Sequence, residues 1–112
     1  MRRLAFVLAL LALGALPSRS NLHPLADFTG AGAAVQLSTN ANIKAKWIQV
    51  IADPGNSAAI RFGDATTSAT VGLSIAKGAG YNTPTCGNCV YQLTAHYLYI
   101  ANGDKVYVAW GD

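Results

Sequence analysis

Two cysteines three positions apart, Cys86 and Cys89, form the sharpest chemical motif of the chain. A zinc site would need two further ligands, and the only histidines of the chain are His23 and His96. A redox pair would need a helix N-terminus to lower the thiol pKa, but the flanking Thr-Pro-Thr and Val-Tyr indicate loop and strand. The motif therefore favours a disulfide across a Gly-Asn turn, with a small entropic contribution because the closed loop is short. Free thiols are the alternative in a cytosolic chain.

Groups suited to acid–base catalysis are few and dispersed. The chain has five acidic residues, all aspartates, and Asp53, Asp64 and Asp104 each lie beside glycine or proline in a predicted turn. Turn formation is their favoured role, because general acid–base chemistry needs groups that converge in a pocket. No serine stands in a nucleophile-elbow context, and the Gly-Ala-Gly segments 30–32 and 78–80 lack the third glycine of a dinucleotide loop. We expect no enzyme, no cofactor and no metal.

The positive charge belongs to the N-terminus rather than to a binding surface. The net charge of the 112 residues is +3, but Arg2, Arg3 and Arg19 lie in the first twenty residues. Beyond them the basic residues fall from eight to five, which balances the five aspartates. These five are scattered along the chain, whereas a nucleic-acid site concentrates lysine and arginine on one face. Nucleic acid is therefore not an expected partner.

The first twenty residues have the order of a secretory signal. Arg2 and Arg3 precede an apolar run over 4–16, Pro17 ends the run, and the small residues Ser18 and Ser20 follow. A helix of that length covers about 20 Å, less than the roughly 30 Å of a bilayer core. Residues 1–20 are expected to be a signal-like or anchoring apolar helical segment. A membrane is a partner only if this segment is retained.

The remainder of the chain reads as short strands separated by turns. Residues 21–32 predict an extended arm or linker, and 33–112 predict one β-sandwich domain. Residues 46–52 are apolar on both faces and predict a central strand, with an Asp-Pro-Gly-Asn turn leading to a hairpin partner at 58–62. The spacing predicts an all-β fold, either a small antiparallel β-sandwich or a jelly-roll-like barrel of about 7–8 short strands.

The last third of the chain suggests an interaction surface. Asn102-Gly103 favours a type I′ hairpin between 97–101 and 105–110. In that hairpin Tyr97, Tyr99 and Tyr107 face away from the aliphatic positions and form an exposed stripe. Tyrosine is favoured at interfaces, so these three are the interface candidates. Half-buried strand residues are the ordinary alternative.

A family resemblance rests on five segments: 46–52, 59–64, 71–78, 97–101 and 103–108. They contain an Arg-x-Gly-Asp turn, glycines six apart, a Tyr-x-Tyr strand and a closing Gly-Asp-Lys-Val-x-Val strand. In this order the chain resembles small β-rich virion structural proteins of tailed bacteriophages, over about residues 35–110. The resemblance implies a head decoration, minor capsid or fibre-associated protein that assembles by surface complementarity. It brings no catalytic residues.

Two functions are therefore expected. The first is a non-enzymatic virion structural protein, a homo-oligomer whose partners are other virion subunits and whose location is the virion. The alternative is an exported periplasmic or cell-surface β-sandwich module that recognises a carbohydrate or a protein receptor. In that alternative the tyrosines, including Tyr81 and Tyr91, could stack on a sugar or contact a receptor.

Overall fold

The structure is a computed structural model that describes residues 22–112. Within them it contains one short 3-10 helix and nine strands, so the all-β class is confirmed, with more strands than expected. The apolar helical segment expected over residues 1–20 lies outside the described part. The elements are β1 (Leu22–Pro24), β2 (Phe28–Thr29), β3 (Ala33–Gln36), β4 (Trp47–Ala52), β5 (Ile60–Gly63), β6 (Leu73–Ile75), β7 (Gly80–Asn82), η2 (Leu93–Ala95), β8 (Tyr97–Ile100) and β9 (Lys105–Gly111).

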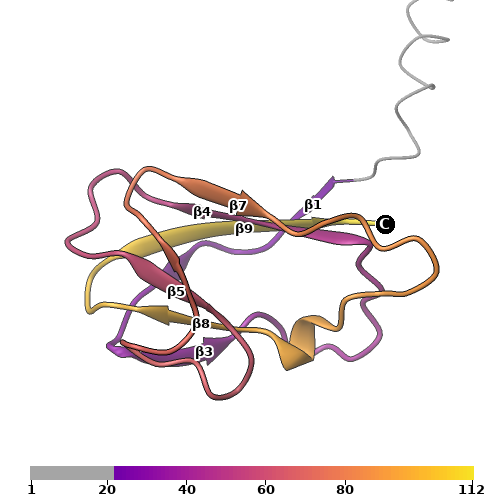
Figure 1. The fold of residues 1–112 in the computed structure, drawn as a ribbon, viewed down its shortest axis with the longest axis horizontal. Coiled ribbons are helices and arrows are strands. Elements are labelled where there is room, and N and C mark those ends of the chain that lie inside the picture. Colours follow the sequence, from indigo (N-terminus) through magenta and orange to yellow (C-terminus); the bar gives the residue numbers. More distant parts are fainter. Residues whose placement is uncertain (1–21) are drawn as a thin grey trace, which may run out of the picture.

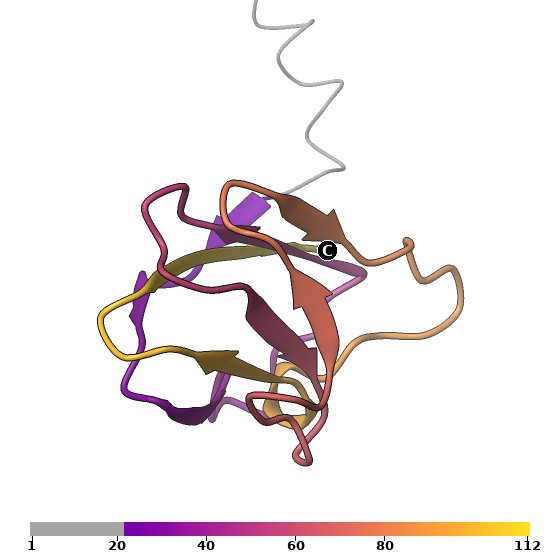
Figure 2. The same cartoon turned by 60° about the vertical axis from the view of Figure 1, so that its left-hand side comes forward.

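The strands form two antiparallel sheets that pack face to face (Figure 1). Sheet A has the order β1-β9-β4-β7, and β2 also pairs with β9. Sheet B has the order β3-β8-β5-β6. Figure 2 shows the two layers with the connecting loops gathered at their ends. Among residues 22–112, no helix is long and apolar enough to cross a membrane.

The core lies between the sheets and follows the alternation of the longest strands. On sheet A, β4 and β9 turn five fully or nearly fully buried side chains inward, and on sheet B, β5 and β8 turn four. Leu93 of η2 closes one end of this core. Burying each such aliphatic side chain contributes about 1.5–3 kcal/mol. The inward core residues of the four strands are Ile48, Val50, Ala52, Val106, Val108, Ile60, Phe62, Leu98 and Ile100.

Both predicted hairpins are wrong. β4 lies in sheet A and β5 in sheet B, so the Asp-Pro-Gly-Asn turn connects the layers instead of pairing its flanking strands. The connection from β8 to β9 crosses in the same way. A type I′ turn needs positive φ at both central residues, but only Gly103 has one, at 84°. The amide of Asp104 donates to the carbonyl of Ala101, so the turn is closed in another geometry.

Polar side chains tie these two crossings together at one end of the sandwich. The buried Asn56 side chain donates to the carbonyl of Lys105 and accepts from its amide, as a neighbouring strand would. The carboxylate of Asp104 accepts from the amides of Ser57 and Ala58 and from the Ser57 hydroxyl. Buried backbone groups in the crossings are thereby satisfied.

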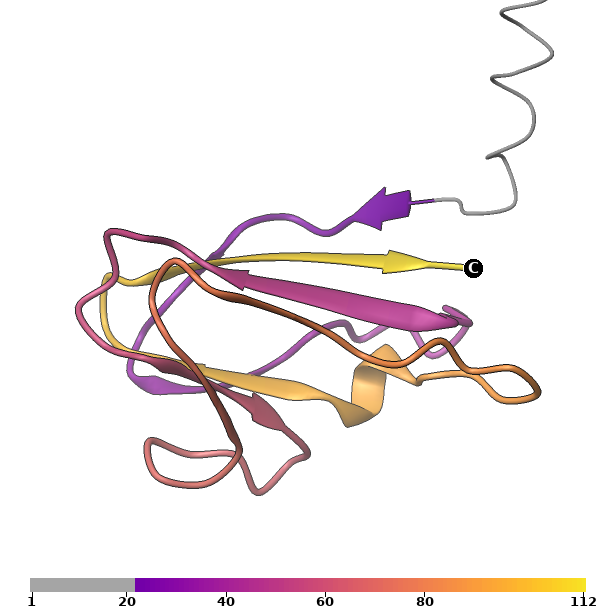
Figure 3. The same ribbon diagram turned by 45° about the horizontal axis from the view of Figure 1, so that its top comes forward.

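The segment expected to be an arm is an edge of sheet A. β1 pairs with residues 109–111 of β9 and β2 with residues 105–106, both antiparallel. Between them, the amide of Leu25 donates to the carbonyl of Val108 at 2.9 Å. Residues 22–29 therefore run along β9, as Figure 3 shows, and the sheet starts before the domain boundary expected at residue 33.

Candidate functional site

The outer face of sheet A gathers the polar and aromatic residues best suited to binding. Trp47, Gln49 and Ile51 of β4 point outward because their neighbours in the strand are buried. Gln49 stands opposite Asn82 of β7 on one side and Ala109 of β9 on the other. The alternation predicted for 46–52 is confirmed, and it displays an indole and an amide on the same side of the sheet.

A depression of about 250 Å³ lies at the Trp47 end of this face. We call it the Trp47 depression. Its lining consists of one indole, two side-chain amides and two hydroxyl-bearing residues: Trp47, Gln49, Asn82, Thr83 and Thr85. No charged side chain belongs to it. Such a lining suits a neutral ligand with an apolar face and several hydroxyl or amide groups.

The position of the indole depends on a glycine of the neighbouring strand. Trp47 pairs with Gly111, and a Cβ atom at position 111 would stand 2.1 Å from Cε2 of Trp47 and 2.3 Å from Nε1. The ring therefore fills the space above the Gly111 backbone. Only glycine permits this approach, so the absence of a side chain at Gly111 lets the indole lie against the sheet.

One wall of the Trp47 depression comes from the segment that follows β7. Thr83 is buried and pairs with Ile48 twice, because its hydroxyl accepts from the Ile48 amide and its amide donates to the Ile48 carbonyl. The Tyr91 hydroxyl donates to the carbonyl of Pro84 at 2.7 Å. The amide of Cys86 donates to the carbonyl of Lys46 at 2.8 Å, so Thr85 lies between the anchored residues Pro84 and Cys86.

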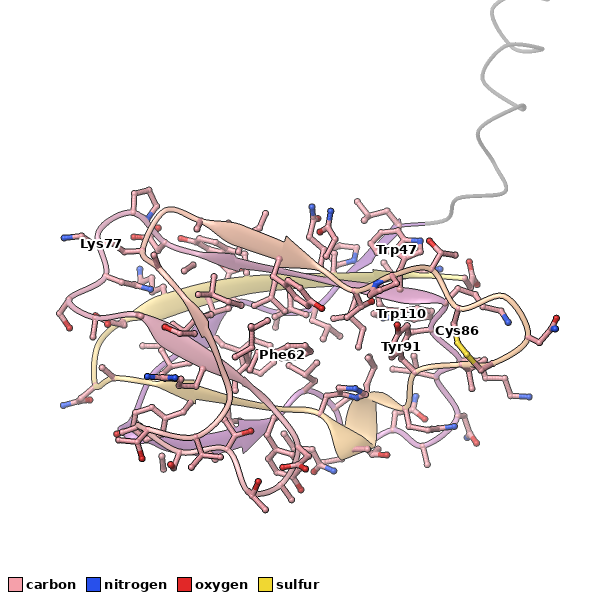
Figure 4. The ribbon with its side chains drawn as sticks, viewed as in Figure 1. Trp47, Phe62, Lys77, Cys86, Tyr91 and Trp110 are labelled. Atoms are coloured by element: carbon pink, nitrogen blue, oxygen red, sulfur yellow. A yellow bond between two sulfur atoms is a disulfide. The ribbon has the colours of Figure 1, made fainter. Side chains whose placement is uncertain are left out.

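The predicted disulfide joins Cys86 and Cys89 next to this wall (Figure 4), with their Cα atoms 5.3 Å apart. The ammonium group of Lys46 donates to the carbonyls of Gly87 and Cys89 and closes the loop from the sheet side. The loop extends beyond one end of the sandwich, the same end at which Trp47 lies (Figures 3 and 4). Both cysteines have a structural partner here, which leaves neither for a zinc site.

A second depression of about 150 Å³ adjoins the first, and both include Gln49. We call it the Tyr107 depression. The residues that line it come from β1 and the segment after it, from β4 and from β9: Pro24, Leu25, Asp27, Gln49, Ile51, Tyr107, Val108 and Ala109. Apart from Gln49, its polar side chains are those of Asp27 and Tyr107.

The Tyr107 hydroxyl is oriented by Asp53. It donates to Oδ1 of Asp53 at 2.8 Å, while Oδ2 of Asp53 accepts from the Gly55 amide at 2.9 Å. The hydrogen bond from Tyr107, and then that from Gly55, lower the pKa of Asp53 below 3.8. The same bond raises the pKa of Tyr107 above 10.0. The phenol therefore stays protonated, and its proton points to Asp53 and away from a ligand.

Of the other two turn aspartates, Asp64 accepts hydrogen bonds within its own turn, whereas Asp104 accepts them from Ser57 and Ala58 in the distant β4–β5 connection. The Thr66 hydroxyl and amide donate to Asp64 and lower the pKa of its carboxyl. The backbone amide of Ser57 is the largest cause of the lowered pKa of Asp104. These carboxylates hold turns together and do not converge.

The histidines serve packing. His23 stacks on Trp110 with ring centroids 4.2 Å apart, and its Nε2 lies 3.5 Å from a carboxylate oxygen of Asp112. His96 stacks on Phe62 and pairs through Nδ1 with the carbonyl of Gln92. Within the described residues, no group of three metal-ligating side chains comes together.

The single tyrosine stripe expected from the sequence is not formed. Tyr97 and Tyr99 lie on the outer side of sheet B, where Tyr99 pairs with Arg61 of β5, whereas Tyr107 lies on sheet A. The reason is the crossing between β8 and β9. Tyr81 and Tyr91 are half-buried against the core. Whether Tyr97, Tyr99 or Tyr107 contacts a partner stays a prediction.

Sequence reasoning missed the residues that line the Trp47 depression. The alternation of Trp47, Gln49 and Ile51 was visible, and an indole two residues from an amide on one strand face was the available signal. The contributions of Asn82 and Thr85 depend on the pairing of β4 with β7, which no local pattern announces.

Comparison with known proteins gives little beyond the fold class. No protein-family model and no curated protein match the chain. Among solved structures it is similar to an RmlC-like cupin protein from Desulfovibrio desulfuricans, with 16% identity over 84% of this chain and 83% of that one and a TM-score of 0.46. The expectation that the chain is not an enzyme is contradicted by this match and is corrected. It rested on missing motifs, and catalytic groups on different strands need no shared motif.

Proposed function

We propose that the protein is a binding module that holds a carbohydrate on the outer face of sheet A. The observation that carries this proposal is the Trp47 depression, in which an indole and the side-chain amides of Gln49 and Asn82 share one uncharged lining. The CH face of a sugar ring packs on an indole, and side-chain amides donate to and accept from its hydroxyls. The depression, at about 250 Å³, is smaller than most small-molecule sites, which suits weak recognition of one sugar unit at a time.

The proposed location is outside the cytoplasm. The signal-like order of residues 1–20 supports export, with the segment cleaved or kept as an anchor. The Cys86–Cys89 disulfide supports an oxidising compartment, because such bonds persist there and are rare in the cytosol.

A second candidate is the virion structural role, as a homo-oligomer bound to other virion subunits. The outer side of sheet B supports it, since Tyr97, Tyr99 and Arg61 are of the types enriched in protein interfaces. From β2 to β9 the successive strands alternate between the sheets, except that β5 and β6 pair in sheet B, and this supports a jelly-roll-like arrangement, which virion proteins use.

The test of the leading proposal is calorimetric titration of the whole protein with a panel of neutral mono- and disaccharides. Trp47→Ala should weaken binding about five- to tenfold, since losing one aromatic stacking contact costs roughly 1–1.5 kcal/mol. Tyr99→Ala, on the opposite sheet, is the matched control and should bind as the parent does. Binding that is absent, or indifferent to Trp47, would contradict the proposal.

The second candidate predicts a different pattern. Replacing Tyr97 and Tyr99 together with serine should reduce the oligomer mass measured by light scattering while the melting temperature changes little. A monomeric parent protein that never copurifies with particles would contradict it.

A further inference from the structure

The two depressions of sheet A adjoin at Gln49, which lines both. Gln49 lies at the centre of the face, between Asn82 of β7 and Ala109 of β9. A ligand bound beside Trp47 can therefore extend along the face toward Tyr107 without leaving it. The side-chain amide of Gln49 can contact both halves of such a ligand, as donor and as acceptor.

The Tyr107 depression offers a different set of groups from its neighbour. Leu25, Ile51 and Pro24 supply apolar contact area. Beyond the shared Gln49, its polar atoms act as acceptors. The Asp27 carboxylate is exposed and offers acceptor oxygens, and the Tyr107 hydroxyl already donates its hydrogen bond to Asp53.

An anionic group would be disfavoured in this depression. Asp27 and Tyr107 line the depression together, and the Tyr107 hydroxyl bonds to the Asp53 carboxylate. The hydrogen bond to Asp53 is the largest cause of the raised pKa of Tyr107, and the charge of Asp27 adds to it, so both negative charges act on this place. A ligand carboxylate, sulfate or phosphate would meet like charge and find few donors. A unit with hydroxyl, amide N–H or ammonium groups would find acceptors.

Resting on the proposed function, we infer that the ligand is a saccharide of at least two linked units, with one unit beside Trp47 and a non-anionic second unit beside Tyr107. The first depression contributes stacking and amide hydrogen bonds. The second contributes apolar contact and selects against acidic sugars through Asp27.

The experiment compares the full-length protein and its variants by calorimetric titration with glucose, cellobiose, N-acetylglucosamine, chitobiose and a galacturonic acid dimer. The parent protein should bind one of the neutral disaccharides at least about tenfold more tightly than its monosaccharide, and should bind the acidic dimer weakest. Ile51→Arg fills the second depression and should bring the disaccharide affinity down to that of the monosaccharide. Ile51 is 38% exposed, so this change leaves the core intact.

Val71→Arg is the matched control, because Val71 is 47% exposed and belongs to neither depression. Asp27→Lys should narrow the preference for neutral over acidic dimers, which a purely structural role would not do. A monosaccharide that binds through Trp47 as tightly as its disaccharide overturns this inference alone. Absence of binding to every sugar, in the parent and in Trp47→Ala, overturns the proposed function and the inference with it.

Discussion

The two outer faces of the sandwich differ in chemistry although they enclose one core. Sheet A carries two adjoining depressions, with an indole held over Gly111 and amides beside it. Sheet B carries the long side chains of Arg61 and Tyr99 on paired strands, and Arg61 donates to the carbonyl of Gly72 at 3.1 Å. A hollowed surface suits a small ligand, whereas tyrosine with arginine suits a protein surface. One fold thus presents two independent candidate interfaces.

The largest effect on the binding face of sheet A is expected from replacing the glycine that lies under Trp47. Gly111→Ala places a Cβ atom 2.1 Å from the indole, so the ring must leave its position. We expect a loss of about 1–3 kcal/mol in the free energy of unfolding and at least tenfold weaker saccharide binding. Thermal melts and titrations measure both.

Gly87→Ala is the control for that substitution, because a Cβ atom at position 87 meets nothing within 4 Å. It should leave both quantities unchanged. If Gly111→Ala also leaves them unchanged, the indole is not held as the structure indicates.

Acid should lower the stability of the fold through Asp53 on the sheet A side and through Asp104. Hydrogen bonds lower the pKa values of Asp53 and Asp104 below 3.8 in the folded chain. Such groups contribute stability above the unfolded pKa and lose it as the pH falls through the folded one. The melting temperature should therefore hold steady from about pH 7 to about pH 5 and decline below about pH 4. Asp53→Asn should show a smaller decline, and a decline equal to that of the parent would contradict this assignment.

Part of this architecture could be predicted from residues close in sequence. The alternation over 46–52 predicts both the buried Ile48 and the outward Trp47, and the Cys-x-x-Cys spacing predicts the disulfide. Strand partners could not be predicted in this way. An Asp-Pro-Gly-Asn turn looks the same whether it closes a hairpin or connects two layers, because the choice depends on which distant strands cover β4.

The candidate site could not be predicted from the sequence for the same physical reason. Gln49 and Asn82 are brought together by pairing across more than thirty residues, and Gly111 matters only because its register sets it opposite Trp47. Local patterns carry the direction of a side chain relative to its strand, not the identity of its cross-strand neighbour.

The smallest effect is expected from the disulfide. In the chain-entropy account, a loop this short contributes less than the roughly 3 kcal/mol of a 15-residue loop. Lys46 also holds the loop by hydrogen bonds to Gly87 and Cys89. Replacing both cysteines with serine should lower the melting temperature by a few degrees and weaken saccharide binding slightly through Thr85. Intact mass should rise on alkylation only after reduction, and alkylation without reduction would show free thiols.

The most direct test of the central claim uses the two tryptophans of the chain as separate reporters. Trp110→Phe leaves Trp47 as the only indole, and Trp47→Phe leaves Trp110, which stacks on His23 away from the depressions. Saccharide titration should change the emission of the Trp110→Phe protein saturably, with the dissociation constant found by calorimetry, and leave the emission of the Trp47→Phe protein constant. Calorimetric binding without any change in Trp47 emission, or a change confined to Trp110, would contradict the assignment of the site to the outer face of sheet A.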